Sequence, residues 1–229
     1  MIKKHSKRYA YLKQIIKPTA LKLDDAINTL KTINKNSFDE TFEVHIALSL
    51  DSRRSDHQIR SSFLLPHGFG IKNRVAVFTT PENIDGAYAA GAFFAGHTSL
   101  LSKISSGAFD FDVLITSSDL VSQLAKFGKI LGPKGLMPSS KVGTISDNFI
   151  KAIGDFNKGR LEYRSDKSGV VHTKFGKLSL ETEALCENFK CVLESVNFCK
   201  PAELRAKYIK SLNICTTMSP SIRVNYSYS

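Results

Sequence analysis

Polar residues able to contact sugars and phosphates alternate with apolar residues early in this sequence. Thr41, Glu43 and His45 flank Phe42 and Val44, and side chains two residues apart share one face of a strand. A hydroxyl, a carboxylate and an imidazole on one face can contact sugar and phosphate groups. A glutamate can also accept a hydrogen bond from a 2′-hydroxyl or an exocyclic amine. The pattern therefore favours a polar surface that contacts a nucleic acid.

Phe38 and the arginines that follow this segment each allow two interpretations. The ring of Phe38, which precedes two carboxylates, either packs into a core or meets an RNA surface. Arg53, Arg54 and Arg60 are candidate phosphate ligands. Alternatively, Arg53 and Arg54 pair with the aspartates beside them in a polar loop. Both interpretations stay open at this point.

A second polar cluster surrounds a turn that we predict at SDKSG, residues 165 to 169. Arg164, Asp166 and Lys167 lie in or beside this turn, and His172 follows on the next strand. The cluster is either a solvent-facing turn or part of an RNA-binding surface.

A third cluster, Thr216, Thr217, Met218 and Ser219, joins the last two predicted strands. Small hydroxyl residues beside a flexible methionine allow close approach of the backbone to a sugar edge. We therefore treat these four residues as candidate RNA contacts.

The sequence lacks the signals of an enzyme. A phosphate-binding loop needs GxxxxGK followed by Ser or Thr, whereas GKILGPKGLMP has Leu136 after its last glycine. The six histidines have no metal-ligand spacing with the four cysteines. We predict no catalytic residue, no metal and no cofactor, and we keep a nucleotide-binding enzyme as the alternative from another class.

The composition favours a polyanionic partner. The 229 residues include 32 Lys and Arg against 21 Asp and Glu, which gives a net charge of +11 and an isoelectric point near 9.5. This exceeds the value of about 9 used for nucleic-acid-binding domains. The hydrophobic share of 42% is typical of a folded chain. With neither a membrane-spanning run nor a secretory signal, we expect a soluble, intracellular protein with reduced cysteines and no membrane partner.

Two glycine-containing breaks divide the chain into three segments. They lie at LLPHGFG, residues 64 to 70, and at DFNKGR, residues 155 to 160. We predict a discontinuous first domain, 1–67 plus 160–229, and an inserted second domain, 68–159. The insert has nine basic and seven acidic residues, so it carries +2 and the flanks carry +9. The flanks are therefore expected to face the polyanion.

Periodicity predicts an α/β protein. The flanks read as a helix over 21–34 with Asp24 as its N-cap, strands over 42–50, 59–65, 208–217 and 221–226, a hairpin around 165–169, and a helix over 181–199. This mixture predicts an α+β domain with antiparallel strands. In the insert, apolar runs at 74–79 and 111–117 each precede a helical stretch. Repeated strand and helix predict a Rossmann-like α/β domain with a parallel sheet.

Four motifs give the sequence a strong resemblance to the first-numbered large-subunit ribosomal protein, the universal L-one family. They are FDETFEVH at 38–45, LGPKGLMPSSKVGTI at 131–145, GRLEYRSDKSGVVH at 159–172 and TTMSPSIRVN at 216–225. The resemblance implies a two-domain, non-enzymatic protein whose first domain binds large-subunit rRNA at the mobile stalk beside the exit site. It further implies a role in release of deacylated tRNA and, in bacteria, repression of the protein's own mRNA.

The resemblance also implies particular contacts. It places Asp166, Lys167 and His172 at or near the RNA, and it adds Ser211. The family usually has a glycine where Ser219 stands, so the backbone there either avoids positive φ or meets RNA more loosely. The glycine-rich string in the insert either forms a rigid loop or presents a basic edge to tRNA, with the residues Lys129, Lys134 and Lys141.

The resemblance implies a location in the large ribosomal subunit. Many lysines and few arginines suggest an AT-rich coding genome, and an absent presequence would suit an organelle-encoded protein. The expected compartment is therefore the mitochondrial matrix, with plastid stroma or bacterial cytoplasm as alternatives. Outside the ribosome we expect a monomer. A free-standing RNA-binding repressor is a further alternative function.

Overall fold

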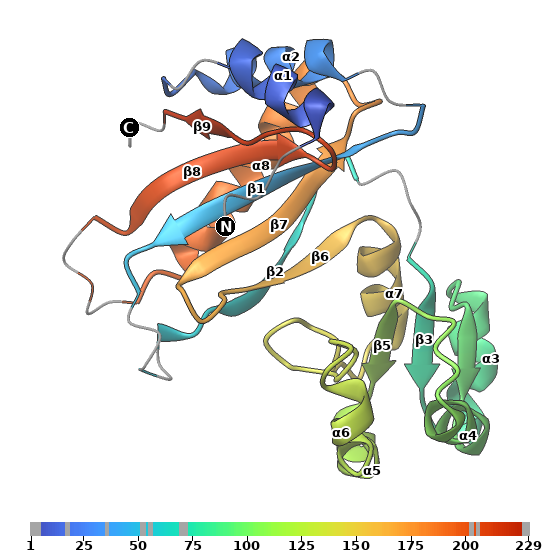
Figure 1. Ribbon diagram of the computed structural model, residues 1–229. Helices are drawn as coiled ribbons and strands as arrows, with labels where there is room; N and C mark the ends of the chain where they lie inside the picture. The colour runs from blue at the N-terminus through green and yellow to red at the C-terminus, as the bar shows by residue number, and fades with distance from the viewer. Residues whose placement is uncertain are drawn as a thin grey trace. The chain divides into compact units, whose positions relative to one another are not determined.

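A computed structural model describes residues 6–16, 19–34, 37–50, 54, 57–68, 73–201, 204 and 207–225 (Figure 1). The chain divides into two compact units, Met1–Phe69 with Glu162–Ser229 and Gly70–Leu161. The boundaries expected from the sequence, 67/68 and 159/160, fall two residues from these divisions. The first unit is thus assembled from both ends of the chain.

The helices and strands of the first unit come from both flanks. They are α1 (Lys7–Ile15), α2 (Leu23–Ile33), β1 (Thr41–Leu48), β2 (Arg60–Leu64), β6 (Arg160–Arg164), β7 (Val170–Lys177), α8 (Thr182–Phe198), β8 (Ile209–Thr216) and β9 (Ile222–Val224), with β6 starting at the end of the second unit. The predicted helix over 181–199 and the predicted strands of the flanks are confirmed within a few residues.

A four-stranded sheet in the order β7-β1-β8-β9 is the centre of the first unit (Figure 1). Its neighbouring strands are all antiparallel. The central strand β1 comes from the first flank, whereas β7 and β8 come from the second. The sheet therefore joins the two flanks across the insert.

The helices α2 and α8 pack together against one face of this sheet. On β1 the buried residues are Phe42, Val44, Ile46 and Leu48, which alternate with half-buried residues that are polar except for Ala47. The ring of Phe175 on β7 lies 5.6 Å from the ring of Phe42 and 5.5 Å from that of Phe189 on α8. The apolar side chains of β1 thus belong to the hydrophobic core between the sheet and the helices.

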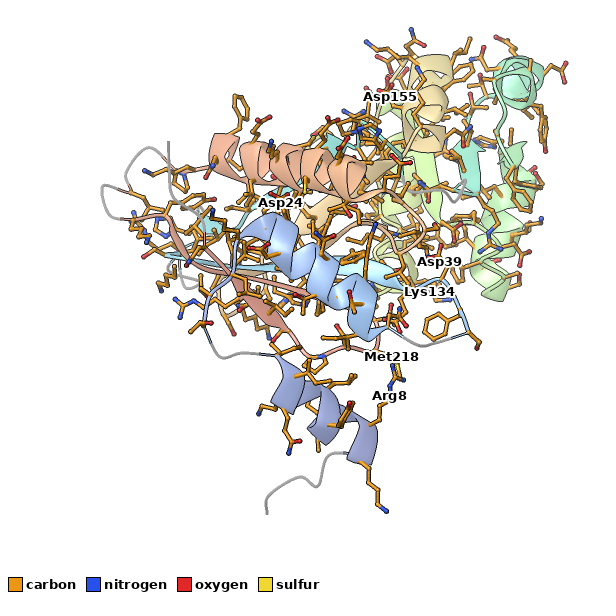
Figure 2. The ribbon with its side chains drawn as sticks, turned by 90° about the horizontal axis from the view of Figure 1, so that it is seen from above. Arg8, Asp24, Asp39, Lys134, Asp155 and Met218 are labelled. Carbon is orange, nitrogen blue, oxygen red and sulfur yellow. The ribbon has the colours of Figure 1, made fainter. Side chains whose placement is uncertain are left out.

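The predicted cap of α2 is wrong, because the helix begins one residue before Asp24. Lys22 occupies the N-cap position and makes no side-chain capping bond. Asp24 instead accepts a hydrogen bond from the Cys186 thiol, with Oδ1 and Sγ 2.9 Å apart, and Figure 2 shows it on the side of α2 next to α8. Its carboxylate thus ties the two helices together.

The predicted hairpin around residues 165 to 169 is a turn whose strands enter different sheets. Beyond one bridge between Ser165 and Val171, β6 pairs with β2 and β7 pairs with β1. Ser165 Oγ accepts a hydrogen bond from the Ile59 amide at 3.0 Å, and the Ser165 amide donates to the Ile59 carbonyl at 2.9 Å. The turn therefore links the two sheets of this unit.

The second unit is an α/β layer structure with a parallel sheet, as predicted. Its elements are β3 (Val75–Phe78), the 3₁₀ helix η2 (Pro81–Asn83), α3 (Ile84–Ala89), β4 (Phe94–Gly96), α4 (Thr98–Ser106), β5 (Val113–Thr116), the 3₁₀ helix η3 (Ser118–Leu120), α5 (Val121–Ala125), α6 (Gly128–Leu131) and α7 (Phe149–Asn157). The sheet order is β4-β3-β5. The sequence patterns did not predict β4, which has only three residues, nor the helices α1, α4, α6 and α7.

The central strand of this parallel sheet is buried on both faces. Val75 and Val77 belong to one apolar cluster with Ile153 of α7. Ala76 and Phe78 belong to another, on the opposite face of the strand, with Leu100 of α4. Burial on both faces explains why this strand is a continuous apolar run. In the described part of the chain, no helix is long and apolar enough to cross a membrane.

The fully buried side chain of Asn188 on α8 satisfies two backbone groups of the first unit. Its amide nitrogen donates to the Phe175 carbonyl at 2.9 Å, and its oxygen accepts from the His67 amide at 3.1 Å. The side chain thus attaches β7 and the segment after β2 to the same helix.

Asn188→Ala should destabilise the protein by about 2–3 kcal/mol, because it leaves the buried Phe175 carbonyl and the partly buried His67 amide without their partner. Urea denaturation followed by circular dichroism measures the loss. Lys190→Ala, an exposed change on the same helix, is the control and should stay within about 0.5 kcal/mol of the wild type. Equal losses in the two variants would show that the Asn188 bonds contribute nothing specific.

Candidate nucleic-acid interface

The face of the four-stranded sheet away from α2 and α8 is polar. The strand register places Arg223, Asn213, His45 and His172 in one row across β9, β8, β1 and β7. These four side chains are half-buried or exposed. We call this surface the open face.

A second row of the open face places Cys215 and Lys174 on either side of Glu43. In a third row, Ser211 lies opposite Ala47. The predicted common face of Thr41, Glu43 and His45 is therefore observed, and Ser211 and His172 lie on the same face. Lys174, Asn213 and Arg223 were not among the predicted contacts, although the alternation of their strands places them on this face.

His45 contacts groups from both neighbouring strands. Its Nδ1 lies 2.8 Å from Nδ1 of His172, and its Nε2 lies 3.2 Å from Sγ of Cys215. Desolvation and the nearby His172 lower the pKa of His45, against the opposing effect of Glu43. Burial and the Glu43 carboxylate raise the pKa of the Cys215 thiol to about 11. At neutral pH the imidazole is therefore uncharged and the thiol is protonated.

The turn directly after β8 consists of Thr217, Met218 and Ser219, and we call it the closing turn. It is hydrogen-bonded to the start of β1. The Thr217 amide donates to the Thr41 carbonyl at 3.1 Å, and Thr217 Oγ1 accepts from the Thr41 amide at 3.1 Å. The Met218 amide donates to the buried carboxylate of Glu40 at 3.3 Å. The Met218 side chain is 52% exposed (Figure 2), so this anchored turn presents a flexible apolar group to solvent.

The interpretation of Thr216 as an RNA contact needs correction. Its side chain is 1% exposed and lies on the core side of β8, because it is out of phase with the open-face residues Ser211, Asn213 and Cys215. Its hydroxyl therefore cannot reach a ligand on the open face.

The backbone at Ser219, where the family usually has glycine, does not need a glycine. No non-glycine residue in the described ranges has positive φ, so the backbone at Ser219 avoids the conformation that would favour glycine. Its Oγ accepts a hydrogen bond from the Thr216 amide at 2.8 Å. The side chain thus closes the turn on itself.

Phe38 is a surface residue. Its side chain is 49% exposed, which excludes the core interpretation. The next residue, Asp39, accepts hydrogen bonds from the amide and the hydroxyl of Ser179, each at 3.0 Å. The aromatic ring is thus presented by an anchored segment.

Asp166 shapes the turn between β6 and β7. Its Oδ1 accepts from the amides of Ser168 at 2.8 Å and Val170 at 2.7 Å, and its Oδ2 lies 3.5 Å from Nε2 of His172. These backbone hydrogen bonds, that of Val170 first, lower the pKa of Asp166. The predicted RNA contact is therefore in the first place a turn-forming residue.

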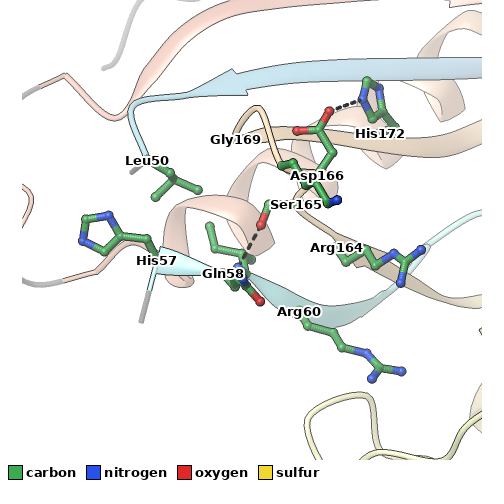
Figure 3. A pocket seen from close by; sticks show the side chains of 11 residues that line it. Leu50, His57, Gln58, Arg60, Arg164, Ser165, Asp166, Gly169 and His172 are labelled. Carbon is green, nitrogen blue, oxygen red and sulfur yellow. Dashed lines mark hydrogen bonds and ion pairs between the residues drawn. The ribbon is translucent and has the colours of Figure 1, made fainter. Parts of the chain in front are cut away.

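A hollow of about 760 Å³ lies beside this turn. Figure 3 shows Arg60 and Arg164 extending from the paired strands β2 and β6, with His57 and His172 at other parts of the wall. Lys167 also lines it. The permanent cations Arg60, Arg164 and Lys167 line this basic hollow. They outnumber the carboxylates of Asp166, in the wall, and of Glu162, which pairs with Arg60, so the hollow is suitable for phosphate.

The arginines predicted either to bind phosphate or to pair with carboxylates differ in their surroundings. Arg60 forms an ion pair with Glu162 of β6, so only part of its charge is available to a phosphate. Arg54 is exposed. Arg53 and the two aspartates proposed as partners lie outside the described residues.

The three lysines predicted to face tRNA, Lys129, Lys134 and Lys141, are all exposed. Lys134 Nζ lies 3.7 Å from the centroid of the Phe109 ring, so its charge has a partner within the unit. Gly135 has φ of 73°, and Leu131 before it is buried. These contacts support the rigid-loop interpretation, while Lys129 and Lys141 add positive charge to the surface.

Comparisons with known proteins agree on one family. The model described as the Ribosomal protein L1p/L10e family matches residues 30–220. Large ribosomal subunit protein uL1 of Prochlorococcus marinus (strain MIT 9312) is 42% identical over 226 residues, covering 99% of this chain and 96% of the relative. Large ribosomal subunit protein uL1c is 44% identical over 224 residues in Guillardia theta (98% and 96% covered) and 45% over 203 in Rhodomonas salina (89% and 87%). The similarity extends through both compact units.

Asp166→Ala should open the turn between β6 and β7, because two backbone amides lose their acceptor. Amide hydrogen exchange at Ser168 and Val170 should become faster, with an expected cost of about 1–2 kcal/mol. Asp166→Asn keeps an acceptor oxygen and should retain most of the protection. If the alanine variant exchanged as slowly as the wild type, the carboxylate would not be what holds the turn.

Proposed function

The chain belongs to the Ribosomal protein L1p/L10e family, and from this premise we propose that its unit Met1–Phe69 with Glu162–Ser229 binds large-subunit rRNA at the mobile stalk. As a member of this family it is a structural component of the large ribosomal subunit and has no enzymatic role. The rRNA target and the residues that contact it are the proposal.

The observation that carries this proposal is the open face, a polar sheet surface flanked by the closing turn and the basic hollow. Both flanks of the chain contribute strands to it. The other unit, Gly70–Leu161, contains ten basic and seven acidic residues and so carries a net charge of +3. The remaining +8 of the total of +11 lies on the unit that carries the open face. Positive charge supplies affinity for phosphate, and polar edges and exposed side chains supply specificity.

The proposed contacts fall into three groups by chemistry. Phe38 and Met218 offer exposed apolar surface for bases, which stack on aromatic side chains. The open face and the closing turn offer polar groups for sugars and base edges, namely Thr41, Glu43, His45, His172, Ser211, Thr217, Ser219 and, from the structure, Asn213. The cations Arg54, Arg164, Lys167 and Lys174 offer phosphate contacts.

Further partners are proposed on the same premise. Lys129 and Lys141 of the second unit are exposed cations that suit the backbone of exit-site tRNA, consistent with assistance in release of deacylated tRNA. The rRNA-binding unit is also the surface that would recognise the protein's own mRNA. The protein is proposed to be monomeric before it joins the ribosome.

The compartment is proposed from the relatives. They include cyanobacterial uL1 and plastid-type uL1c proteins, which favour a plastid or bacterial ribosome. The mitochondrial matrix expected from composition gains no support from them.

Phe38→Ala should weaken binding to a stalk rRNA fragment by about 1–3 kcal/mol, the value of one base stacked on an aromatic ring. Equilibrium binding to the fragment and to an unrelated duplex measures the effect. Phe198→Ala removes a ring that is 92% exposed at the end of α8 and should leave binding unchanged. If both variants bound like the wild type, Phe38 would be no contact, and if the wild type did not prefer the stalk fragment, the proposed target would be wrong.

Lys167→Ala should lower the slope of log K against log salt by about 0.7–0.9, because one phosphate contact is lost. Binding to specific and unrelated RNA should weaken alike. The matched control is Lys190→Ala, which removes the same charge from α8. A slope unchanged in Lys167→Ala, or reduced equally in Lys190→Ala, would argue against a phosphate contact at the basic hollow.

A further inference from the structure

Three side chains with metal-binding chemistry meet on the open face. Glu43, His45 and Cys215 offer a carboxylate oxygen, an imidazole nitrogen and a thiol sulfur, and these atoms all lie within 4.8 Å of one another. We propose that these three residues form a Zn²⁺ site. The proposal does not rest on RNA binding, although Glu43 and His45 also belong to the surface proposed to contact RNA.

The sheet register creates this triangle. Glu43 and His45 are two residues apart on β1 and therefore point to the same face. Cys215 lies directly opposite Glu43 on β8. The intervening Val44 and the neighbouring Phe42 are fully buried, so packing on the other side of the sheet fixes the backbone that carries the ligands.

The separations of the donor atoms suit a tetrahedral zinc ion. Zn–S bonds of about 2.3 Å and Zn–N bonds of about 2.1 Å place sulfur and nitrogen roughly 3.6 Å apart in a tetrahedron. Nε2 of His45 and Sγ of Cys215 are 3.2 Å apart, so small side-chain rotations suffice. Binding replaces the thiol proton, which is released to solvent as the thiolate coordinates the ion.

Hydrogen bonds orient the imidazole for this role. The Nδ1 of His45 is 2.8 Å from Nδ1 of His172, and Nε2 of His172 is 3.5 Å from the Asp166 carboxylate. One proton arrangement fits every contact: His45 donates from Nδ1, His172 accepts there, and His172 directs its Nε2–H toward Asp166. The lone pair of His45 Nε2 then points toward Cys215, as a metal ligand requires.

The donor set favours zinc over harder cations. A thiolate and an imidazole select borderline and soft metals, whereas Mg²⁺ and Ca²⁺ prefer oxygen ligands only. Three protein ligands leave a fourth position, which on this sheet faces away from the core. A site of this type holds the ion and leaves one coordination position for water or another ligand.

Cobalt substitution on the full-length, reduced protein without RNA tests the site. Co²⁺ should give a near-ultraviolet sulfur-to-cobalt charge-transfer band and intense visible bands of tetrahedral coordination, and one equivalent of Zn²⁺ should abolish both. Cys215→Ser should lose the charge-transfer band. Cys191→Ser, which changes a half-buried thiol on α8, should keep it. A wild-type protein without the band, or a band that survives Cys215→Ser, overturns the proposal.

Two further variants separate ligands from orienting groups. Glu43→Gln, which keeps the side-chain shape, should weaken Zn²⁺ affinity by more than about tenfold in competition with a chelating dye. His172→Asn should weaken it about 10–100-fold, as for other outer-shell partners, while the charge-transfer band persists because sulfur remains bound. Unchanged zinc affinity in Glu43→Gln would overturn the site even if Cys215→Ser failed to fold.

Discussion

The pairing register of β1 with β7 and β8 is the constraint on which the first unit depends. Side chains alternate along β1, so the register that buries Phe42, Val44 and Ile46 also places Glu43 and His45 on the open face. A shift by one residue would exchange the two faces and bury the polar groups. Because β1 belongs to one flank and its partners to the other, the same register also closes the discontinuous unit.

Carboxylates hold the edges of the open face. Asp39 binds Ser179, Glu40 binds the Met218 amide, and Asp166 binds two amides of its turn. Each accepts hydrogen bonds from backbone groups that would otherwise need water. The exposed groups beside them, the Phe38 ring and the Met218 side chain, are thereby presented from ordered backbone, which reduces the entropy lost on binding. Acidic residues are thus compatible with a basic unit that we propose to bind RNA.

The second unit forms its hydrophobic core from its own residues. Its parallel sheet is buried on both faces, and the glycine-rich string is held by the buried Leu131, the positive φ of Gly135 and the contact of Lys134 with Phe109. A loop with these internal contacts presents a stable surface. That suits a unit whose proposed partner is tRNA, while rRNA is the proposed partner of the other unit.

Local patterns in the sequence determined the long elements and the faces of the strands. Period-two alternation in β1 and helical spacing in α8 depend only on neighbouring residues, so they could be predicted, as could the parallel sheet of the insert. Capping depends on where a helix begins within one residue, and the misassigned Asp24 reflects this. Thr216 was predicted as an RNA contact together with its exposed neighbours because all of them belong to one motif. Membership in a motif does not determine which face of the strand a residue occupies.

Tertiary structure alone decided which distant residues meet. His45, His172 and Cys215 are 127 and 170 positions apart in their hydrogen-bonded pairs, and no spacing rule can connect them. The cross-strand register brings them together, as it brings Glu40 to the closing turn and Asn188 to two separate backbone segments. Register is fixed by the burial of the whole apolar face at once, which is a property of the folded sheet and not of any local segment of sequence.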